Sequence, residues 1–592
     1  MKGSIVQRQF ARVARATVAK TVKPIPSYVH GVSSTPLIHD TVGDRLLQAV
    51  EEVPDKELVY FRHQKIRKTY EQFYYDVRKL ARGFLRMGLV PGDRIGMWGP
   101  NYYEWICTQY AAALAGMIQV NVNPAYQAEE LKYALNKVGV RALVTPRNFR
   151  KSNYYGTLEK LIPGLDSSPL GEGMVRSKEL PHLEHLIMIC EPTSLPGAWN
   201  YSDVFESGTN DEERQLEKIE ARNGPDTPVN IQYTSGTTGY PKAATLTNHN
   251  IVNNAYLTGL ATNYHIGEHR LCIPNPLYHC FGCVMGTLNA VVHKQSIVFP
   301  DAWFNPGPTL DAVEEEKCTA LYGTPTMFVD VFKHGIEGRD LSSLRSGYIA
   351  GSPCPVALCE RMVNELGLVD LAVLYGSTEL SPIVTVSRLS DPPLHRIRNV
   401  GYVSAHTELC VVDKEDGIVP RGVKGELLAR GYMLMSGYFN DEEKTKKEIT
   451  STRWYHTGDT AIMNEDGAIS IVGRTKDMII RGGENIYPTE IEQFMFRLPY
   501  MADAQVIGVP DERFGEAVCA WVMLKNGFDN VTPEQIKNDC REKMAHYKVP
   551  AYICIKKQED FPVTATGKIR KVEMREIARK ELGLENIKGS FD

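Results

Sequence analysis

Short apolar runs alternate with helical repeats along the first part of the chain. Val59–Phe61, Arg94–Trp98 and Ile118–Val122 each have the pattern of a buried strand. Between the first two, apolar residues spaced four, three and four positions apart over 73–84 predict one face of a helix. A second helix is expected to end near Ala115. Strands that alternate with helices are typical of parallel sheets covered on both faces, which predicts an α/β chain.

The pattern changes twice further along the chain. Residues 164–226 are richer in proline, glycine, serine and charge, which favours a long surface excursion. After residue 472 a glycine-rich segment precedes a unit of roughly 115 residues, which is small enough to be a separate domain. The full length of 592 residues is too long for one ordinary core, so we expect several domains.

The composition argues against several classes of protein. The chain has 67 basic and 71 acidic residues, and a formal charge of −4 argues against a nucleic-acid surface. Its 12 cysteines lack the rhythm of a disulfide framework, which indicates a reducing compartment. Cys280 and Cys283 form a C-x-x-C without a second pair at zinc spacing, so we interpret them as buried thiols. No apolar run reaches transmembrane length, because glutamine, glycine and asparagine interrupt even residues 105–122.

The N-terminus is basic and amphipathic. Residues 1–39 contain no acidic side chain, and Asp40 is the first. Apolar residues between positions 6 and 17 share one helical face, and arginines at the same spacing share the opposite face. This pattern predicts a mitochondrial transit peptide and leader over residues 1–40, cleaved between residues 20 and 45, with the matrix as the destination. The alternative is a surface-binding or disordered basic tail.

The most informative segment is Tyr233-Thr-Ser-Gly-Thr-Thr-Gly-Tyr-Pro-Lys242. Its hydroxyls, glycines and lysine supply donors with little bulk, which suits a phosphate-rich ligand. Pro241 precedes the lysine and no serine or threonine follows it, so this is not the P-loop of many NTPases. A strand over Val229–Tyr233 is expected before it, and a helix capped by Thr247 or Asn248 after it. A plain polar loop is the alternative for this segment alone.

Further polar segments follow in a fixed order. Each alone has an ordinary explanation, as a structural histidine, a strand-ending turn or a solvated lysine. They are Pro276-Leu-Tyr-His-Cys-Phe-Gly282, Tyr348-Ile-Ala-Gly-Ser-Pro353, Leu374-Tyr-Gly-Ser-Thr-Glu379, Trp454-Tyr-His-Thr-Gly-Asp459, the segment from Gly473 to Glu492, and Pro562-Val-Thr-Ala-Thr-Gly-Lys568. In this order they resemble the adenylate-forming enzymes: acyl- and aryl-CoA ligases, firefly luciferase and the adenylation domains of peptide synthetases. The resemblance covers nearly all of the chain after the N-terminal address.

The resemblance implies a fold and two half-reactions. It implies an α/β chain with an α+β lid: a large multi-sheet N-terminal domain over residues 41–475 and a small mobile C-terminal domain over 476–592. A carboxylic acid would react with ATP to give acyl-AMP and pyrophosphate, and CoA would then displace AMP. Mg²⁺ would accompany ATP. The expected ligands are these small molecules, not nucleic acid. Peripheral membrane contact and oligomeric state stay open.

The resemblance also implies nucleotide-binding roles for the matching residues. The phosphate loop would hold the phosphates that leave as pyrophosphate, and comprises Thr234, Ser235, Gly236, Thr237, Thr238, Gly239, Tyr240, Pro241 and Lys242. Gly351 and Ser352 would also bind ATP. Tyr375 would stack on adenine, Thr378 would contact the phosphate and Glu379 would hold Mg²⁺. Asp459 would bind the ribose hydroxyls, with Arg474 on the ribose or phosphate side.

The remaining matches concern chemistry, hinge motion and the acyl group. Lys568 would enter the site and stabilise the carboxylate and phosphate during adenylation. His279 would lie near the reacting carboxylate and gate the acyl pocket. Lys476 would be the hinge, and Gly482 and Gly483 would lie beside the pantetheine arm of CoA, where the absence of a Cβ permits close approach.

The acyl pocket is the least defined part of this interpretation. A helix from Phe281 to Val292 and the turn at 322–328 are expected to line it, with Met285, Met327 and Phe328 as candidates. Gly376 stands where acetate-activating relatives carry tryptophan, which favours a larger acid. The whole pattern is most similar to the mitochondrial medium-chain acyl-CoA ligases. An aryl-CoA ligase of the coumarate type shares every motif, and a non-catalytic nucleotide-binding relative is a further alternative.

Overall fold

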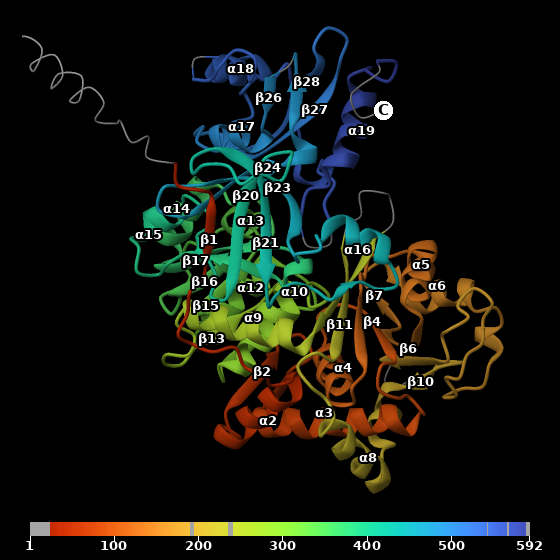
Figure 1. Cartoon of the computed structure of the whole chain (residues 1–592). Coiled ribbons are helices and arrows are strands. Elements are labelled where there is room, and N and C mark those ends of the chain that lie inside the picture. Colours follow the sequence, from red (N-terminus) through yellow and green to blue (C-terminus); the bar gives the residue numbers. More distant parts are fainter. Residues whose placement is uncertain are drawn as a thin grey trace, which may run out of the picture.

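The computed structural model describes residues 24–189, 194–234, 241–482, 484–541, 543–564 and 567–587. The described part of the large domain carries three large sheets and a two-stranded one, β7 (Asn148–Phe149) with β8 (Ser152–Asn153), and a small C-terminal domain sits on one end of it (Figure 1). The α/β fold with a smaller C-terminal domain, predicted from the sequence, is confirmed.

The first sheet has eight strands and a parallel centre. β9, β6, β4, β5 and β11 run parallel, whereas β12 and β22 are antiparallel additions at one edge. In spatial order the strands are β10 (Trp199–Asn200), β9 (His185–Ile189), β6 (Val140–Pro146), β4 (Arg94–Trp98), β5 (Ile118–Val122), β11 (Pro228–Thr234), β12 (Lys242–Thr247) and β22 (Gly437–Tyr438).

The second sheet has nine strands, again with a parallel centre. In spatial order they are β19 (Tyr402–Val403), β18 (Ile383–Val386), β17 (Asp370–Gly376), β16 (Ser346–Ile349), β15 (Ala320–Gly323), β13 (Arg270–Cys272), β14 (Ser296–Phe299), β2 (Glu57–Phe61) and β3 (Ile66–Thr69). Because β15, β16 and β17 are parallel neighbours, their carboxyl ends meet at one edge, where ligands of such sheets bind.

A third sheet of five strands is antiparallel. Its order is β1 (Tyr28–His30), β20 (Thr407–Val412), β21 (Lys424–Gly431), β23 (Tyr455–Met463) and β24 (Ile469–Arg474). β1 lies within the predicted leader, yet it pairs with β20 from Tyr28 to His30. The flanking Ser27 and Gly31 also exchange backbone hydrogen bonds with the same sheet.

Apolar helices fill the space between the first two sheets. One continuous core joins them to the third sheet. Every residue of α4 except Glu104 is buried, which fits the mainly apolar composition of residues 105–114: a helix covered on all sides needs no polar face. The helices of this core are α2 (Val42–Glu52), α3 (Tyr70–Arg86), α4 (Tyr103–Leu114), α9 (Asn248–Ala261), α10 (Cys280–Gly282), the π-helical turn η2 (Cys283–Leu288) and α11 (Asn289–Val292).

The outer faces of the two large sheets carry their own helices. α5 (Ala128–Val138) and α6 (Tyr154–Leu161) cover the first sheet. α12 (Pro306–Glu315), α13 (Pro325–His334) and α14 (Val356–Glu365) cover the second. The predicted surface excursion over 164–226 is only partly right, because it contains the buried strand β9 and the helices α7 (Tyr201–Glu206) and α8 (Asn210–Glu220), which pack on α3.

The C-terminal domain, called the lid below, has its own sheet and two apolar clusters. Its strands are β25 (Ile479–Arg481), β26 (Glu484–Ile486), β27 (Met501–Asp511), β28 (Gly515–Leu524) and β29 (Tyr552–Ile555). Its helices are α17 (Pro488–Met495), α18 (Pro533–Arg541) and α19 (Lys571–Glu581). No helix among the described residues is long and apolar enough to cross a membrane.

Candidate active site

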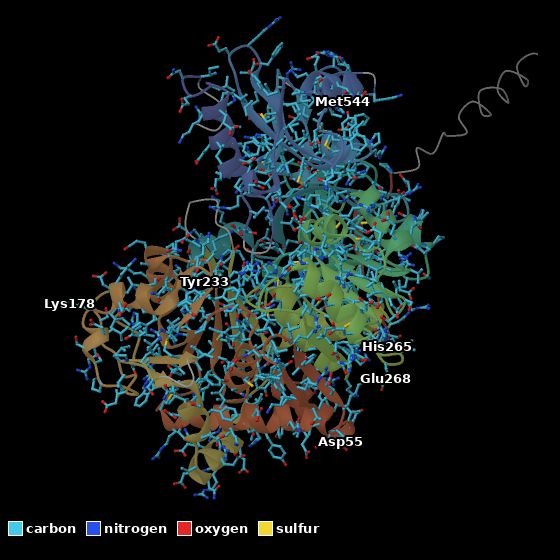
Figure 2. The ribbon with its side chains drawn as sticks, turned by 180° about the vertical axis from the view of Figure 1, so that it is seen from behind. Asp55, Lys178, Tyr233, His265, Glu268 and Met544 are labelled. Atoms are coloured by element: carbon cyan, nitrogen blue, oxygen red, sulfur yellow. The ribbon has the colours of Figure 1, made fainter. Side chains whose placement is uncertain are left out.

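The phosphate segment connects β11 to β12. Ser235, Gly236, Thr237, Thr238, Gly239 and Tyr240 lie outside the described residues. The two strands are antiparallel and pair Thr234 with Lys242, so the ends of the segment lie side by side. Figure 2 labels Tyr233, which lies on the part of the large domain nearest the lid, far from Asp55 and His265. The predicted helix after the segment is confirmed as α9, with Thr247 as its N-cap, but β12 comes first.

A polar network joins Lys242 to the predicted metal ligand Glu379. Glu379 is 5% exposed, and its Oε1 accepts hydrogen bonds from the hydroxyls of Thr234 and Tyr438, both at 3.0 Å. The Tyr438 hydroxyl lies 2.9 Å from Lys242 Nζ. Lys242 Nζ in turn binds Glu448 on α16 (Glu442–Glu448), at 2.7 and 2.9 Å from the two carboxylate oxygens. Among the described residues, the hydrogen bonds to the Glu379 side chain arrive at Oε1.

A second group gathers the predicted adenine and ribose ligands. β23 and β24 place Asp459 directly opposite Arg474, whose Nε lies 3.3 Å from Asp459 Oδ1. The Tyr375 hydroxyl donates to Asp459 Oδ2 at 2.7 Å. Burial is the largest cause that raises the pKa of Tyr375, so this phenol stays a donor. The carboxylate is therefore held from both sides by residues of two different sheets.

Lys568, on the lid, lies near Asp459 and Arg474. Thr326 Oγ1, in the first turn of α13, donates to the carbonyl oxygen of Gly567 at 2.9 Å. The Lys568 backbone is closed into a tight turn by hydrogen bonds with Thr564. The positive charge of Arg474 and removal from water lower the pKa of Lys568 to about 8, against the opposing effect of Asp459. Lys568 and Arg474 thus lie close enough to repel one another.

His279 lies close enough to Lys568 to be influenced by its charge. It is the N-cap of α10, and its Nδ1 accepts from the backbone N–H of Phe281 at 3.2 Å. Removal from water and then the charge of Lys568 lower the pKa of His279 to about 4, so the ring is neutral at pH 7. The neighbouring Cys280 Sγ lies 3.8 Å from the hydroxyl of Thr378. The structure therefore brings the predicted residues His279, Thr378 and Lys568 together.

Gly351 and Ser352 follow β16 at the shared edge of the strands. Gly351 has φ +94°, a conformation that favours glycine, and the space for its Cβ is bounded by Thr324 at 3.4 Å. Lys476, the predicted hinge residue, is exposed overall, but partial removal of its ammonium from water and the charge of Lys242 lower its pKa. Gly482 adopts φ +59° beside the ring of Phe514, whereas Gly483 lies outside the described residues.

The residues expected around the acyl group divide between two cores. Met285, on η2, is fully buried in the inner core between the sheets. Phe328 packs instead in the outer core with α12 and α14, because α13 turns it over Gly323 to the other face of the sheet. Phe328 and Met285 therefore pack in different cores. Met327 is 4% exposed, and its sulfur lies 3.9 Å from the amide nitrogen of Asn275.

Gly376 has a different structural reason from the one expected. A Cβ at this position would lie 1.7 Å from the carbonyl oxygen of Pro382. The strand pair β17–β18 therefore needs glycine for close backbone approach. The space in the Cβ direction is filled by backbone, so it does not by itself enlarge an acyl pocket.

Two interpretations of individual residues can be compared directly with the structure. Cys280 and Cys283 are buried free thiols, as interpreted from the sequence, and burial raises the pKa of both, that of Cys280 to about 12. Within the described residues no group of three or more histidine, cysteine and acidic side chains could hold a metal.

Sequence reasoning missed Tyr438, Glu448 and Thr326. They contact the site through long-range folding, and a lone tyrosine, glutamate or threonine carries no sequence signal.

Comparisons with known proteins agree with this geometry. Residues 46–439, more than half of the chain, match the AMP-binding enzyme family, and residues 490–568 match the AMP-binding enzyme C-terminal domain. A medium-chain acyl-CoA ligase of Danio rerio, ACSF2, described as mitochondrial, is 46% identical over 94% of this chain and 91% of its own length. A putative acyl-CoA synthetase of Bacillus subtilis, YngI, is 40% identical over 94% of this chain and 99% of its own.

A solved structure extends the comparison to the fold. The anthranilate CoA ligase AuaEII in complex with anthranoyl-AMP superposes with a TM-score of 0.80, covering 93% of this chain and 99% of that one, at 24% identity. The same layered architecture thus occurs in that ligase at low sequence identity. By the match of both domains and the near full-length similarity to its relatives, the chain belongs to the AMP-binding enzyme family.

Proposed function

We propose that this protein is an AMP-forming acyl-CoA ligase that activates a medium-chain fatty acid. The observation that carries the proposal is the convergence of Lys568, Asp459 and Glu379 on one edge of the large domain, with the lid closed over it. Its 46% identical relative is named a medium-chain acyl-CoA ligase, which favours a fatty over an aryl acid.

The first half-reaction joins two anions. An oxygen of the carboxylate attacks the α-phosphorus of ATP, the bond between the α-phosphorus and the bridging oxygen breaks, and pyrophosphate leaves. Neutralising charge and positioning the reactants provide most of the catalysis in such a step. Lys568, Arg474 and Lys242 supply the positive charge, and Asp459 with Tyr375 provides a platform for the nucleoside.

Glu379 is the residue that would hold Mg²⁺. A buried carboxylate with one oxygen that accepts no hydrogen bond from the described residues fits an ion that takes one or two protein carboxylates and completes its shell with phosphates and water. When bound, the ion would neutralise phosphate charge. Thr234 and Tyr438 fix the carboxylate in the orientation this role requires.

The second half-reaction needs a different lid position. The thiol of CoA loses its proton to water, its sulfur attacks the acyl carbonyl carbon, and the bond to AMP breaks. We propose that the lid turns about Lys476, withdraws Lys568 and brings Gly482 and Gly483 toward the CoA arm. The neutral His279 is suited to line the path of the acyl group without attracting a second anion.

We also propose mitochondrial import. The basic, acid-free N-terminus and the mitochondrial relative support it. The pairing of β1 with β20 favours cleavage before Ser27, because a later cut would remove a strand from the third sheet. The matrix is the proposed destination.

A substrate panel tests the proposed activity. Purified protein with ATP, Mg²⁺ and CoA is expected to form thioester and AMP fastest with saturated acids of roughly 6 to 12 carbons, since an apolar pocket gains about 0.8 kcal/mol per buried methylene until its end is reached. Mass spectrometry of the thioester and quantification of AMP provide the measurement. An absence of thioester with every fatty and aromatic acid would overturn the ligase assignment, whereas a preference for coumarate-like acids would overturn the substrate class.

Lys568→Ala is expected to separate the half-reactions. Acyl-AMP formation should fall by roughly 100-fold or more, because a charge that stabilises the transition state is lost. Thioester formation from preformed acyl-AMP should change little, because Lys568 is withdrawn by then. Single-turnover quench-flow measures each step. Equal slowing of both steps would contradict a moving lid.

The pKa of Lys568 predicts an alkaline limit. A cation with a pKa lowered to about 8 is protonated below that pH and loses its charge above it, so kcat/KM for ATP in adenylation should fall as pH rises through about 8. Lys568→Arg keeps its charge to far higher pH and should move this limb beyond pH 10, even if the variant is slower. An unchanged limb in Lys568→Arg would assign the titration to another group.

N-terminal sequencing of the protein recovered from mitochondria tests the proposed import and cleavage of the transit peptide. The first residue is expected between positions 20 and 27. Recovery of intact Met1 would exclude cleavage, and a start after Gly31 would contradict a structural role for β1.

A further inference from the structure

The ammonium of Lys242 is fully engaged within the protein. Its hydrogen bonds go to both carboxylate oxygens of Glu448, at 2.7 and 2.9 Å, and to the Tyr438 hydroxyl at 2.9 Å. An ammonium has three N–H donors, so these contacts use its whole capacity. Lys242 also lies 4.7 Å from the centre of the Tyr438 ring, a cation–π contact.

This arrangement conflicts with the work expected of Lys242. On the proposed function, which this inference extends, Lys242 binds the phosphates that leave as pyrophosphate. A phosphate oxygen can reach the ammonium only by replacing a contact with Glu448 or Tyr438. The side chain of Lys242 is 10% exposed and that of Glu448 is 26% exposed, so water screens the pair only in part.

Glu448 is placed to interact with a second lysine as well. It ends α16, which contacts β23, and β23 in turn contacts the hinge turn η4 (Thr475–Asp477). The pKa of Lys476 responds to both Lys242 and Glu448, which supports their closeness in space. Glu448 therefore lies near both Lys242 and Lys476.

Glu448 is also linked to the proposed metal ligand. Its carboxylate accepts a hydrogen bond from the Tyr438 hydroxyl, and the same hydroxyl lies 3.0 Å from Glu379 Oε1. One hydroxyl proton cannot be donated to both carboxylates in full strength. The Tyr438 hydroxyl thus links Lys242 and Glu448 to Glu379 by hydrogen bonds.

We propose that Glu448 is a positioning residue that competes with pyrophosphate for Lys242. In the resting enzyme it neutralises the lysine and holds it at the entrance of the phosphate site. ATP displaces it, and after adenylation the carboxylate recaptures the ammonium as pyrophosphate leaves. The pair thereby weakens the binding of the product and promotes its release before the lid turns.

The test is the affinity for magnesium pyrophosphate in Glu448→Gln. The amide keeps the shape of the side chain but loses its charge, so pyrophosphate should bind about three- to tenfold more tightly, the size expected for a partly exposed ion pair. Titration calorimetry without acid or CoA measures this directly. In turnover, the KM for ATP should fall and kcat should fall as well, because product release slows.

Matched variants separate competition from a structural effect. Glu448→Asp keeps the charge and should remain near the wild-type affinity. Glu443→Gln, on the exposed side of the same helix, should change nothing. In a Lys242→Met background, Glu448→Gln should lose its effect on pyrophosphate, because the cation for which it competes is gone.

The outcomes distinguish this inference from the proposed function. If Glu448→Gln folds normally and binds pyrophosphate with unchanged or weaker affinity, the competition is wrong even though thioester formation persists. If the wild-type protein forms no thioester from any acid, the ligase assignment fails, while the calorimetric comparison still decides whether Glu448 competes for Lys242.

Discussion

Repulsion between positive charges is the constraint on which the site depends. Lys568 arrives from the lid beside Arg474 of the large domain, and the fall in the pKa of Lys568 to about 8 reflects the cost of that meeting. Carboxylates of the large domain offset this electrostatic cost, because they form ion pairs with the cations of the site. Asp459 pairs with Arg474, and Glu448 pairs with Lys242. A site that binds a polyanion must also be stable without it. Cations that form ion pairs with carboxylates are stable in the unliganded protein, and a phosphate can replace the carboxylate when it binds.

The sheets of the large domain bring the charged residues of the site together. Parallel strands β15, β16 and β17 end at one edge, so the turns after them share a small volume, and the third sheet adds Asp459 and Arg474 from another direction. None of these elements could hold the site alone. The buried helix α4 and the π-helical turn η2 fill the space between the sheets and fix their spacing.

Features that depend on residues close together in the sequence were predicted correctly, whereas features that depend on contacts between distant segments were not. Local patterns predicted β5 over Ile118–Val122 and the Thr247 cap of α9, because strand alternation and capping depend on neighbouring residues. β9 was missed because its partner β6 lies about 40 residues away and the intervening chain is polar. Motif order located Lys568 and Asp459, but Glu448 and Tyr438 stayed hidden, since only folding brings them to Lys242. The close approach of Pro382 to Gly376 could not be predicted from the sequence, because it depends on the pairing of two strands.

The contact between lid and large domain has the character of an interface that can open. Thr326 binds the carbonyl of Gly567, the amide of Gln493 binds the carbonyl of Cys354, and Lys333 binds Gln558. These are hydrogen bonds near solvent, and each can be exchanged for water at a small net cost. The apolar clusters of the lid are instead internal to it, joined by the partly buried Val329 from the large domain. Polar contacts of this kind set the angle of a domain without locking it. Repulsion between Lys568 and Arg474 acts in the same direction: in the proposed reaction, loss of the pyrophosphate anion would restore it and favour the lid movement that we propose for the second half-reaction.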